Sequence, residues 1–361
     1  MWGSVNRIDT FLELVVKQNG SDLHMVAGNP PRIRLYGDLY PVKYRELTSE
    51  ESNDLIAEIM SDSARRALET RHSLDFAYDV PGLARFRVNV FRHLRGLGAV
   101  FRVIRTTLSS LDDLNMPPVL KTFCMQRRGL ILVTGPTGSG KSTTLAAMID
   151  FINQDRQEHI ITIEDPVEFI HPQKRCLVSQ REIGLNAGSF AGALRSSLRE
   201  DANVVLVGEL RDLETIGLAV TAAETGILVL ATLHTSGAAA TVDRMVNVFP
   251  GGEQPLIRSM LSTSLCGVVS QQLVRRLDGK GMVAAVEVLV NTPAVANILR
   301  EGKTELLTSV IQAGALVGMQ SLDNSLRHLL DAKLISGGEA YRKAANKAAF
   351  EQFRERDEES A

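Results

Sequence analysis

The pattern of apolar and polar positions differs between the first third of the chain and the rest. Apolar residues recur at helical spacing from Ile8 to Val16. Strand-like runs follow at residues 22–26, 31–35, 75–78, 84–91 and 98–104. Between them, Thr48 and Glu51 have the spacing of a capping box, which predicts a helix that continues to Met60. These elements predict a small α+β domain over residues 1–105.

The pattern changes after a polar segment that ends in Pro117 and Pro118. We interpret residues 106–118 as a linker that is flexible at first and stiffened by the two prolines. Continuous apolar runs then occupy 129–134, 159–163, 204–207 and 227–231, with helical stretches between them. Such runs are typical of strands covered on both faces, so we predict an α/β fold with a mostly parallel sheet from about residue 119 to 290. Helices predicted at 321–332 and 339–353 complete a second domain over residues 119–361.

Composition and charge narrow the class of protein. The chain has 361 residues, of which 44% are hydrophobic and 23% charged, values that exclude a disordered or coiled-coil protein. Lys and Arg number 40 against 42 Asp and Glu, so the whole chain has no electrostatic reason to bind nucleic acid. We expect a protein of the cytoplasm, because we find neither a signal peptide nor an apolar run of membrane-spanning length.

The segment from Gly135 to Ser142 matches the pattern G-x-x-x-x-G-K-[ST]. It lies between a predicted strand and a predicted helix, which is where phosphate binding needs it, so a simple Gly-rich turn is the weaker interpretation. Lys141 is expected to reach the phosphates of a nucleotide and Ser142 to ligate Mg²⁺. The full set of predicted nucleotide-binding residues in this loop is Gly135, Pro136, Thr137, Gly138, Ser139, Gly140, Lys141, Ser142 and Thr143.

Two carboxylates follow further predicted strands. Glu164 opens a Glu-Asp-Pro sequence that is either a turn or a source of general-base chemistry at the carboxyl edge of the sheet. Glu209 follows a strand that is similar to a Walker B strand, with Gly208 where an Asp is usual. The acid available to Mg²⁺ is then Glu209, and the sequence leaves open which of Glu164 and Glu209 takes the proton.

A histidine, His234, ends the last of these apolar runs. A lone histidine at a strand end is commonly structural, but the convergence of the other motifs on the same edge favours a γ-phosphate sensor. Apart from Lys141, we expect the second domain to contribute few positively charged side chains to the nucleotide site.

Taken in order, four segments resemble the secretion and type IV pilus ATPases: GPTGSGKST, ITIEDPVEF, LVGELRDLET and LATLHTSGAAATVDRMVNVFP. The resemblance spans about residues 6 to 345. Two further segments, SDLHMVAGNPPRIRLYGDL and GMQSLDNSL, are similar to the pilus retraction motors in particular. The family implies a PAS-like N-terminal domain followed by a RecA-like P-loop ATPase domain with a helical C-terminal region.

The resemblance also implies a function. It implies a homo-hexameric motor that uses ATP and Mg²⁺ to retract a type IV pilus by disassembling pilin. Its partners would be an inner-membrane platform protein and the pilin machinery at the cytoplasmic face of the inner membrane. A pilus assembly or type II secretion ATPase, a RecA-like nucleic-acid motor and an accessory subunit with little turnover remain alternatives. The chain lacks the paired C-x-x-C motif that assembly ATPases often carry.

Members of this family use arginines of the N-terminal domain against the nucleotide of an adjoining subunit. Arg85, Arg95 and Arg102 are therefore the candidates for an arginine finger. A solvated polar strand face or a nucleic-acid groove would also explain this basic segment. Arg195 and Arg199, spaced i and i+4, are candidates for either phosphate or salt-bridge contacts.

Overall fold

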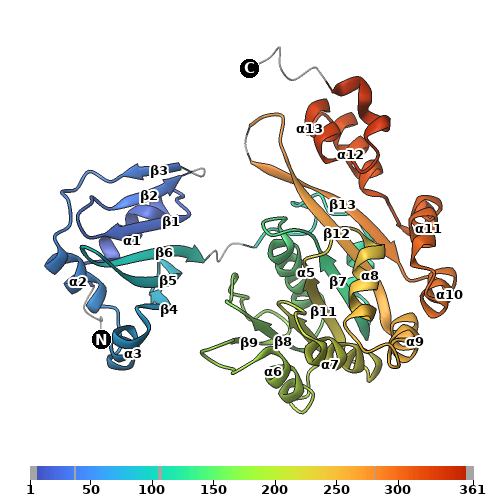
Figure 1. The fold of residues 1–361 in the computed structure, drawn as a ribbon, viewed down its shortest axis with the longest axis horizontal. Helices are drawn as coiled ribbons and strands as arrows, with labels where there is room; N and C mark the ends of the chain where they lie inside the picture. Colours follow the sequence, from blue (N-terminus) through green and yellow to red (C-terminus); the bar gives the residue numbers. More distant parts are fainter. Residues whose placement is uncertain (1–5, 36–37, 105–107, 280, 355–361) are drawn as a thin grey trace. The chain divides into compact units, whose positions relative to one another are not determined.

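The computed structural model describes residues 6–35, 38–104, 108–279 and 281–354 (Figure 1). It divides into two compact units, Met1–Thr107 and Leu108–Ala361.

Within its described residues, the first unit is a six-stranded antiparallel sheet with three helices. The strand order is β3-β2-β1-β6-β5-β4. The strands are β1 (Asp22–Val26), β2 (Arg32–Leu35), β3 (Asp38–Pro41), β4 (Ser73–Val80), β5 (Ala84–His93) and β6 (Gly96–Ile104). The helices are α1 (Asp9–Lys17), α2 (Ser49–Ala57) and α3 (Asp62–Arg71).

Period-two alternation gives this sheet one apolar and one charged face. Phe86, Val88 and Val90 of β5 are buried with apolar residues of all three helices. The alternate residues Arg85 and Arg87 therefore lie on the opposite face, since successive side chains of a strand point to opposite sides. This face explains the basic spacing in the sequence.

The predicted capping box is confirmed, because the Thr48 hydroxyl accepts a hydrogen bond from the Glu51 amide (3.1 Å). The helix it opens ends at Ala57, before Met60. Two elements of this unit were not predicted. In α3 only Leu68 is buried, which leaves no apolar stripe to detect, and all four residues of β3 are exposed.

The second unit is built on a seven-stranded sheet of order β13-β12-β7-β11-β10-β8-β9. The strands are β7 (Gly129–Thr134), β8 (His159–Glu164), β9 (Leu177–Glu182), β10 (Val204–Val207), β11 (Leu228–Leu233), β12 (Leu265–Arg275) and β13 (Met282–Val290). Neighbouring strands are parallel except β12 and β13, which form an antiparallel pair. The α/β fold with a mostly parallel sheet is thus confirmed.

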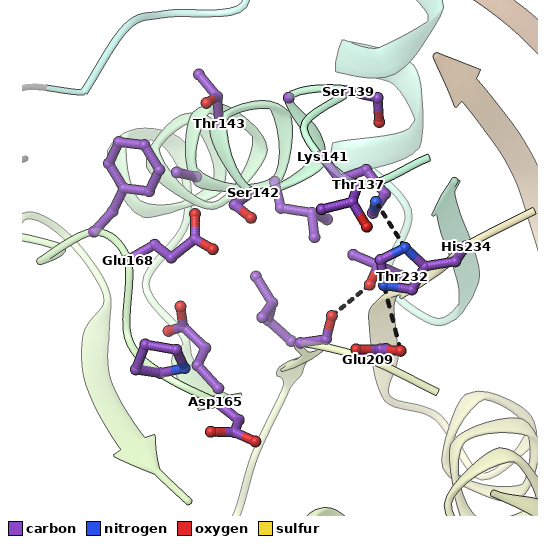
Figure 2. A pocket seen from close by; sticks show the side chains of 18 of the residues that line it. Thr137, Ser139, Lys141, Ser142, Thr143, Asp165, Glu168, Glu209, Thr232 and His234 are labelled. Carbon is purple, nitrogen blue, oxygen red and sulfur yellow. Dashed lines mark hydrogen bonds and ion pairs between the residues drawn. The ribbon is translucent and has the colours of Figure 1, made fainter. Parts of the chain in front are cut away.

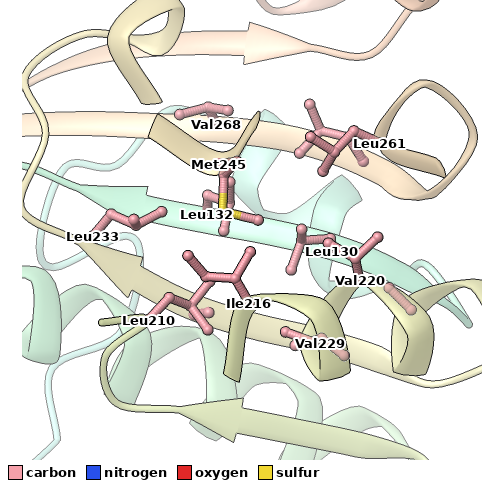
Figure 3. Close-up of a cluster of buried hydrophobic side chains, with 14 of the residues drawn as sticks. Leu130, Leu132, Leu210, Ile216, Val220, Val229, Leu233, Met245, Leu261 and Val268 are labelled. Atoms are coloured by element: carbon pink, nitrogen blue, oxygen red, sulfur yellow. The ribbon is translucent and has the colours of Figure 1, made fainter. Parts of the chain in front are cut away.

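Helices cover both faces of this sheet. One face packs against α4 (Val119–Cys124) and α5 (Lys141–Asp155). The other packs against α6 (Phe190–Ser197), α7 (Leu213–Glu224), α8 (Ala238–Asn247) and α9 (Gln254–Ser264). Figure 3 shows Ile216 and Val220 of α7, Met245 of α8 and Leu261 of α9 in this cluster. In β7, Leu130 and Leu132 pack on the face covered by α6 to α9, while Ile131 and Val133 pack on the face covered by α4 and α5. Every β7 residue is buried, which is why the strand appears in the sequence as an unbroken apolar run.

The C-terminal region is helical but is not divided as predicted. It contains α10 (Pro293–Glu301), α11 (Leu307–Ala313), α12 (Leu322–Asp331), α13 (Gly337–Lys343) and the 3₁₀ segment η3 (Lys347–Phe353), with shorter 3₁₀ turns η1 (Thr304–Leu306) and η2 (Ala315–Val317). The single helix predicted at 339–353 is wrong, because α13 and η3 are separate. The Asp323 carboxylate accepts hydrogen bonds from the amides of Ala345 and Asn346 (2.8 and 3.0 Å), which takes the chain out of the helix there.

Residues 106–107 of the predicted linker lie outside the described residues, and the remainder belongs to the second unit. Leu111 and Met116 are buried in the cluster that includes α4 and α5. The polar segment therefore overlaps the core of the second unit.

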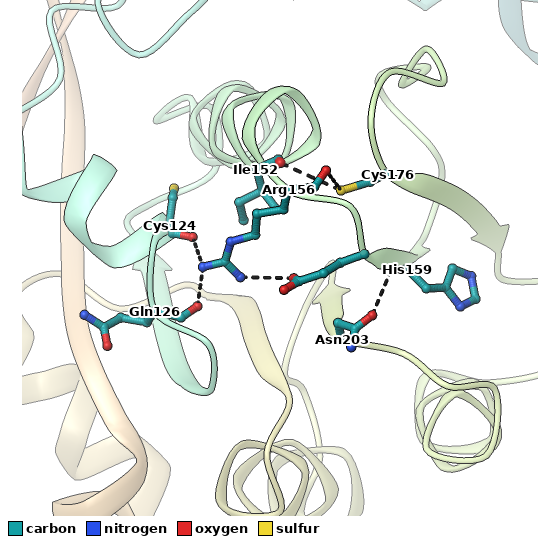
Figure 4. Close-up of polar contacts among 8 residues, drawn as sticks. Cys124, Gln126, Ile152, Arg156, His159, Cys176 and Asn203 are labelled. Carbon is teal, nitrogen blue, oxygen red and sulfur yellow. Dashed lines mark hydrogen bonds and ion pairs between the residues drawn. The ribbon is translucent and has the colours of Figure 1, made fainter.

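An arginine with a mostly covered side chain, Arg156, ties α4 to the end of α5 (Figure 4). The Arg156 guanidinium donates to the carbonyl oxygens of Cys124 (2.6 Å) and Gln126 (2.5 Å) and pairs with Glu158 (3.2 Å). It thereby satisfies carbonyls at the C-terminal end of a helix that has no further turn to bond them. Among the described residues, no helix combines the length and apolar content needed to cross a membrane.

Candidate active site

A cavity of about 350 Å³ lies where the carboxyl ends of the parallel strands meet the start of α5 (Figure 2). Its walls include Thr137 to Thr143, Glu164, Glu209 and His234. The fold therefore brings the four sequence motifs together at one edge of the sheet, as the parallel strand arrangement predicts.

The loop between β7 and α5 has the backbone of a phosphate-binding loop. Gly135, Gly138 and Gly140 all have positive φ (142°, 77° and 86°), a region that favours glycine. Gly135 and Pro136 do not line the cavity; their carbonyl oxygens accept hydrogen bonds from the Lys141 ammonium (2.8 and 3.0 Å). Burial holds the pKa of Lys141 below its ordinary value, although the nearby carboxylates of Glu209 and Glu168 oppose this shift.

Glu164 ends β8, and two side chains hold one of its oxygens. The Thr162 hydroxyl (2.6 Å) and the Gln180 amide (3.3 Å) both donate to Oε1. Burial nevertheless raises the pKa of Glu164 to about 7. A carboxylate with a pKa near neutrality is suited to accept a proton during catalysis.

Glu209 is the centre of a chain of charged and polar groups. Its Oε2 pairs with Arg211 (2.8 Å) and its Oε1 with His234 Nε2 (3.3 Å). The other imidazole nitrogen, Nδ1, lies 3.5 Å from Lys141 Nζ (Figure 2). Burial of Glu209 opposes ionisation, but Arg211 and His234 outweigh it and hold the pKa of this carboxyl below its usual range. Glu209 is thus an anion that already has two partners.

The structure explains why Gly208 replaces the usual Walker B aspartate. A Cβ at this position would lie 3.1 Å from the Ile163 carbonyl oxygen and 3.3 Å from the Glu164 Cα. The Gly208 amide donates to the same Ile163 carbonyl (2.7 Å), so strands β10 and β8 stay close together where they end. A side chain here would be in tight contact with β8 and would require the strand ends that carry Glu209 and Glu164 to shift by a few tenths of an ångström.

Several site residues were missed from the sequence. Arg211 lines the cavity, so the expectation of little cationic help beyond Lys141 is wrong. Arg211 could have been predicted as a site residue, because it follows Glu209 by two residues at the same strand end. Glu168 was also missed; it lines the cavity and lies on the side of Ser142 in Figure 2. Asp165, which follows Glu164 in the Glu-Asp-Pro sequence expected at this edge, lines the cavity too. Gln180 could not be predicted as a site residue, since its strand, β9, is too polar to be recognised as a strand from the sequence.

The arginine candidates of the first unit are not brought together within that unit. Arg102 pairs with Asp22 (2.9 Å) and Arg85 with Asp79 (3.7 Å), at one end of the β5–β6 hairpin. Arg95 lies at the turn of the hairpin, about 20 Å from Arg102 at roughly 3.4 Å per strand residue. Arg85 and Arg102 therefore lie near one another, and Arg95 lies apart from both. In the second unit, Arg195 forms an ion pair with Glu214.

The chain is similar to known proteins along most of its length. The chain is 51% identical over 337 residues to "Type IV pilus retractation ATPase PilT" of Pseudomonas aeruginosa, covering 93% of this chain and 98% of that protein. It is 51% identical over 316 residues to "Twitching motility protein" of Neisseria gonorrhoeae, covering 88% and 84%. The fold is similar to the "Crystal Structure of the Pilus Retraction Motor PilT and Bound ADP", with a TM-score of 0.90, 39% identity and coverage of 97% and 100%.

The sequence model of the family described as "Type II/IV secretion system protein" matches residues 4–329. This range takes in both the antiparallel unit and the sheet that carries the cavity. The chain therefore belongs to the Type II/IV secretion system protein family and is one of its ATPases.

Proposed function

We propose that this ATPase powers the retraction of type IV pili, and with it twitching motility. The observation that carries the proposal is the convergence of Lys141, Ser142, Glu164, Glu209 and His234 on one cavity. The similarity to retraction proteins along almost the whole chain supports the direction of movement. In this proposal the first unit is PAS-like and the second RecA-like.

The residues present fit a Mg²⁺-bound nucleotide. The cavity is open above the start of α5, a helix of 15 residues whose first amides and dipole favour phosphate. Backbone amides of the loop and Lys141 would bind the phosphates, and Ser142 and Glu209 would hold the metal. When bound, Mg²⁺ supplies neutralisation of the charge on the phosphate oxygens.

We assign separate roles to the remaining groups. Glu164, with its pKa near 7, takes the proton from the attacking water. His234, held between Lys141 and Glu209, contacts the γ-phosphate and reports its presence to both. Glu209 is the weaker candidate for the base, because its lowered pKa makes it a poor proton acceptor.

We further propose that the protein works as a homo-hexamer in which one subunit completes the site of the next. Arg85 and Arg102, or Arg95, then supply positive charge to the nucleotide of a neighbour. The ring would act on an inner-membrane platform protein and the pilin machinery at the cytoplasmic face of the inner membrane, without nucleic acid. Each closure of the site would move one domain against the other.

Deletion of the gene tests this function. Excess surface pili without twitching, restored by the wild-type gene and not by a Glu164→Gln allele, would support retraction. Cells without pili would instead indicate an assembly ATPase. Hydrolysis stimulated several-fold by DNA or RNA in the purified protein would overturn both in favour of a nucleic-acid motor.

A further inference from the structure

Gln271 of β12 lies directly behind the phosphate-binding loop. Its side chain is buried, with 1% of the residue exposed. The amide nitrogen donates to the carbonyl oxygen of Ser139 (2.6 Å), and the amide oxygen accepts from the Thr144 hydroxyl (2.9 Å). One side chain, about 130 positions away in sequence, thus joins the loop to the first turn of α5.

The glycines at both ends of the loop pack against the same residue. A Cβ at Gly135 would lie 2.2 Å from the Gln271 carbonyl oxygen, and a Cβ at Gly140 would lie 3.2 Å from the Gln271 amide nitrogen. At Gly135 there is therefore no room for a further atom against Gln271, and at Gly140 the Gln271 amide would have to shift by a few tenths of an ångström. Glycine at these two positions is therefore favoured for two reasons: the contact with Gln271 leaves little space for a side chain, and the positive φ suits glycine.

The hydrogen bond to Ser139 fixes the direction of an amide. In a trans peptide the carbonyl and the following N–H point in opposite directions in one rigid plane. Because the Ser139 carbonyl is held toward Gln271, the Gly140 N–H points away from β12. An N–H oriented in this way is what a loop needs in order to bind phosphate oxygens.

The residue before Gln271 has a matching role on the other face of the sheet. The Ser270 hydroxyl accepts from the amide of Gly237 (2.8 Å), three residues after His234. Successive strand residues point to opposite faces, so β12 holds the phosphate-binding loop with one side chain and the loop of His234 with the next.

We propose that Gln271 is a positioning residue for nucleotide phosphates, acting through the Ser139–Gly140 peptide. The proposal rests on the nucleotide site proposed above. It predicts that the loss of Gln271 weakens binding of the phosphates in the ground state and in the transition state alike. Such a loss appears in KM and in ADP affinity rather than in kcat.

The test compares Gln271→Met with Gln272→Met in the full-length chain. Met has a similar length but neither donates nor accepts as the amide does, and Gln272 is the next residue of the same strand, outside the cavity wall. ADP titration by calorimetry in the presence of Mg²⁺ gives Kd, and steady-state ATP hydrolysis gives KM and kcat. Circular dichroism melting shows that each variant is folded.

In Gln271→Met we expect the Kd for ADP and the KM for ATP to rise about tenfold, with kcat within about threefold of wild type. In Gln272→Met both constants should stay within about twofold. Unchanged ADP affinity in Gln271→Met, or a loss confined to kcat at normal KM, would overturn the proposal, because a smaller folded fraction lowers kcat alone.

Thr144→Val provides a second variant if Gln271→Met does not fold. It removes the donor that holds the Gln271 amide in place, and we expect the Kd for ADP to rise about threefold. Wild-type affinity in this variant would contradict the proposal equally. Failure of the wild-type protein to bind ADP would instead contradict the nucleotide site itself.

Discussion

Arg211 and Glu209 form an ion pair of 2.8 Å at the cavity, through Glu209 Oε2. His234 occupies the other carboxylate oxygen at 3.3 Å. Both oxygens of the acid assigned to the metal therefore have a partner within the chain. Glu209 must give up one of these contacts, or share it, before it can support a cation.

Removing Arg211 should strengthen the response to Mg²⁺. In Arg211→Ala we expect the Mg²⁺ concentration for half-maximal ATP hydrolysis to fall about threefold, a modest effect because the guanidinium is largely exposed. A Mg²⁺ titration at saturating ATP measures this, with Arg195→Ala as the control, since Arg195 pairs with Glu214 outside the cavity. An unchanged Mg²⁺ requirement would show that Arg211 does not compete with the metal.

Lys141→Ala should abolish ATP hydrolysis. The Lys141 ammonium is held against the loop by the Gly135 and Pro136 carbonyls, and without it the loop itself offers the phosphates only backbone dipoles. Phosphate release by the purified protein is the measurement. Lys121→Ala is the matched control, because Lys121 pairs with Asp112 away from the cavity. Wild-type turnover in Lys141→Ala would contradict the assignment of the loop.

Hydrolysis should depend on pH through Glu164. Because the base must be ionised and burial raises the pKa of Glu164 to about 7, kcat should fall as pH drops below 7. Glu164→Gln should still bind ADP but lose about 10²-fold or more in kcat and lose this pH dependence. A rate profile from pH 5.5 to 9 checks both, and a Gln variant with normal turnover would return the role of base to Glu209.

The same carboxyl should destabilise the folded protein at high pH. The folded state binds this proton more tightly than the unfolded state, so its contribution to the free energy of unfolding decreases as pH rises from 4.5 to about 7. At pH 8, Glu164→Gln should therefore be more stable than wild type by about 1–2 kcal/mol, less than full burial implies because the cavity admits water. Urea unfolding at pH 8 and pH 5 measures the difference, which should shrink at the lower pH.

Arg156→Met should destabilise the second unit by about 2–4 kcal/mol. The change leaves the carbonyls of Cys124 and Gln126 and the carboxylate of Glu158 without their charged partner, whose side chain is only 9% exposed. Arg195→Met, which removes an exposed ion pair, should cost less than about 1 kcal/mol. Urea unfolding of the two variants side by side provides the comparison. Equal losses in the free energy of unfolding would show that Arg156 contributes no more than an exposed ion pair.

Mixing inactive subunits tests whether an arginine acts on a neighbour. Lys141→Ala and Arg102→Ala should each be inactive alone and recover part of the activity when co-assembled, because some sites then join an intact loop to an intact arginine. Lys141→Ala mixed with Glu164→Gln should not recover, since those residues line one cavity in the same chain. Verified co-assembly of the first pair without recovery would exclude Arg102 as a residue that acts in trans.

The sequence by itself determined the elements whose signal is local. The buried strands of the second unit appear as unbroken apolar runs because helices cover both sheet faces, and the phosphate-binding loop is readable because its glycines are fixed by the backbone. The carboxyl ends of β7, β8, β10 and β11 share one edge by the rule of parallel strands. Lys141, Glu164, Glu209 and His234 could therefore be placed together before any coordinates.

Only the tertiary structure decided which groups act on one another. Strands β9 and β12 supply Gln180 to Glu164 and Gln271 to the loop, yet nothing near these glutamines in sequence marks them, because their partners come from remote segments. Two glutamates with the same ordinary pKa diverge because burial dominates at Glu164 while Arg211 and His234 dominate at Glu209. Composition and residue spacing reveal neither how far a carboxyl group is removed from water nor how close it lies to a positive charge. These two quantities set the different pKa values of the proposed base, Glu164, and the proposed metal ligand, Glu209.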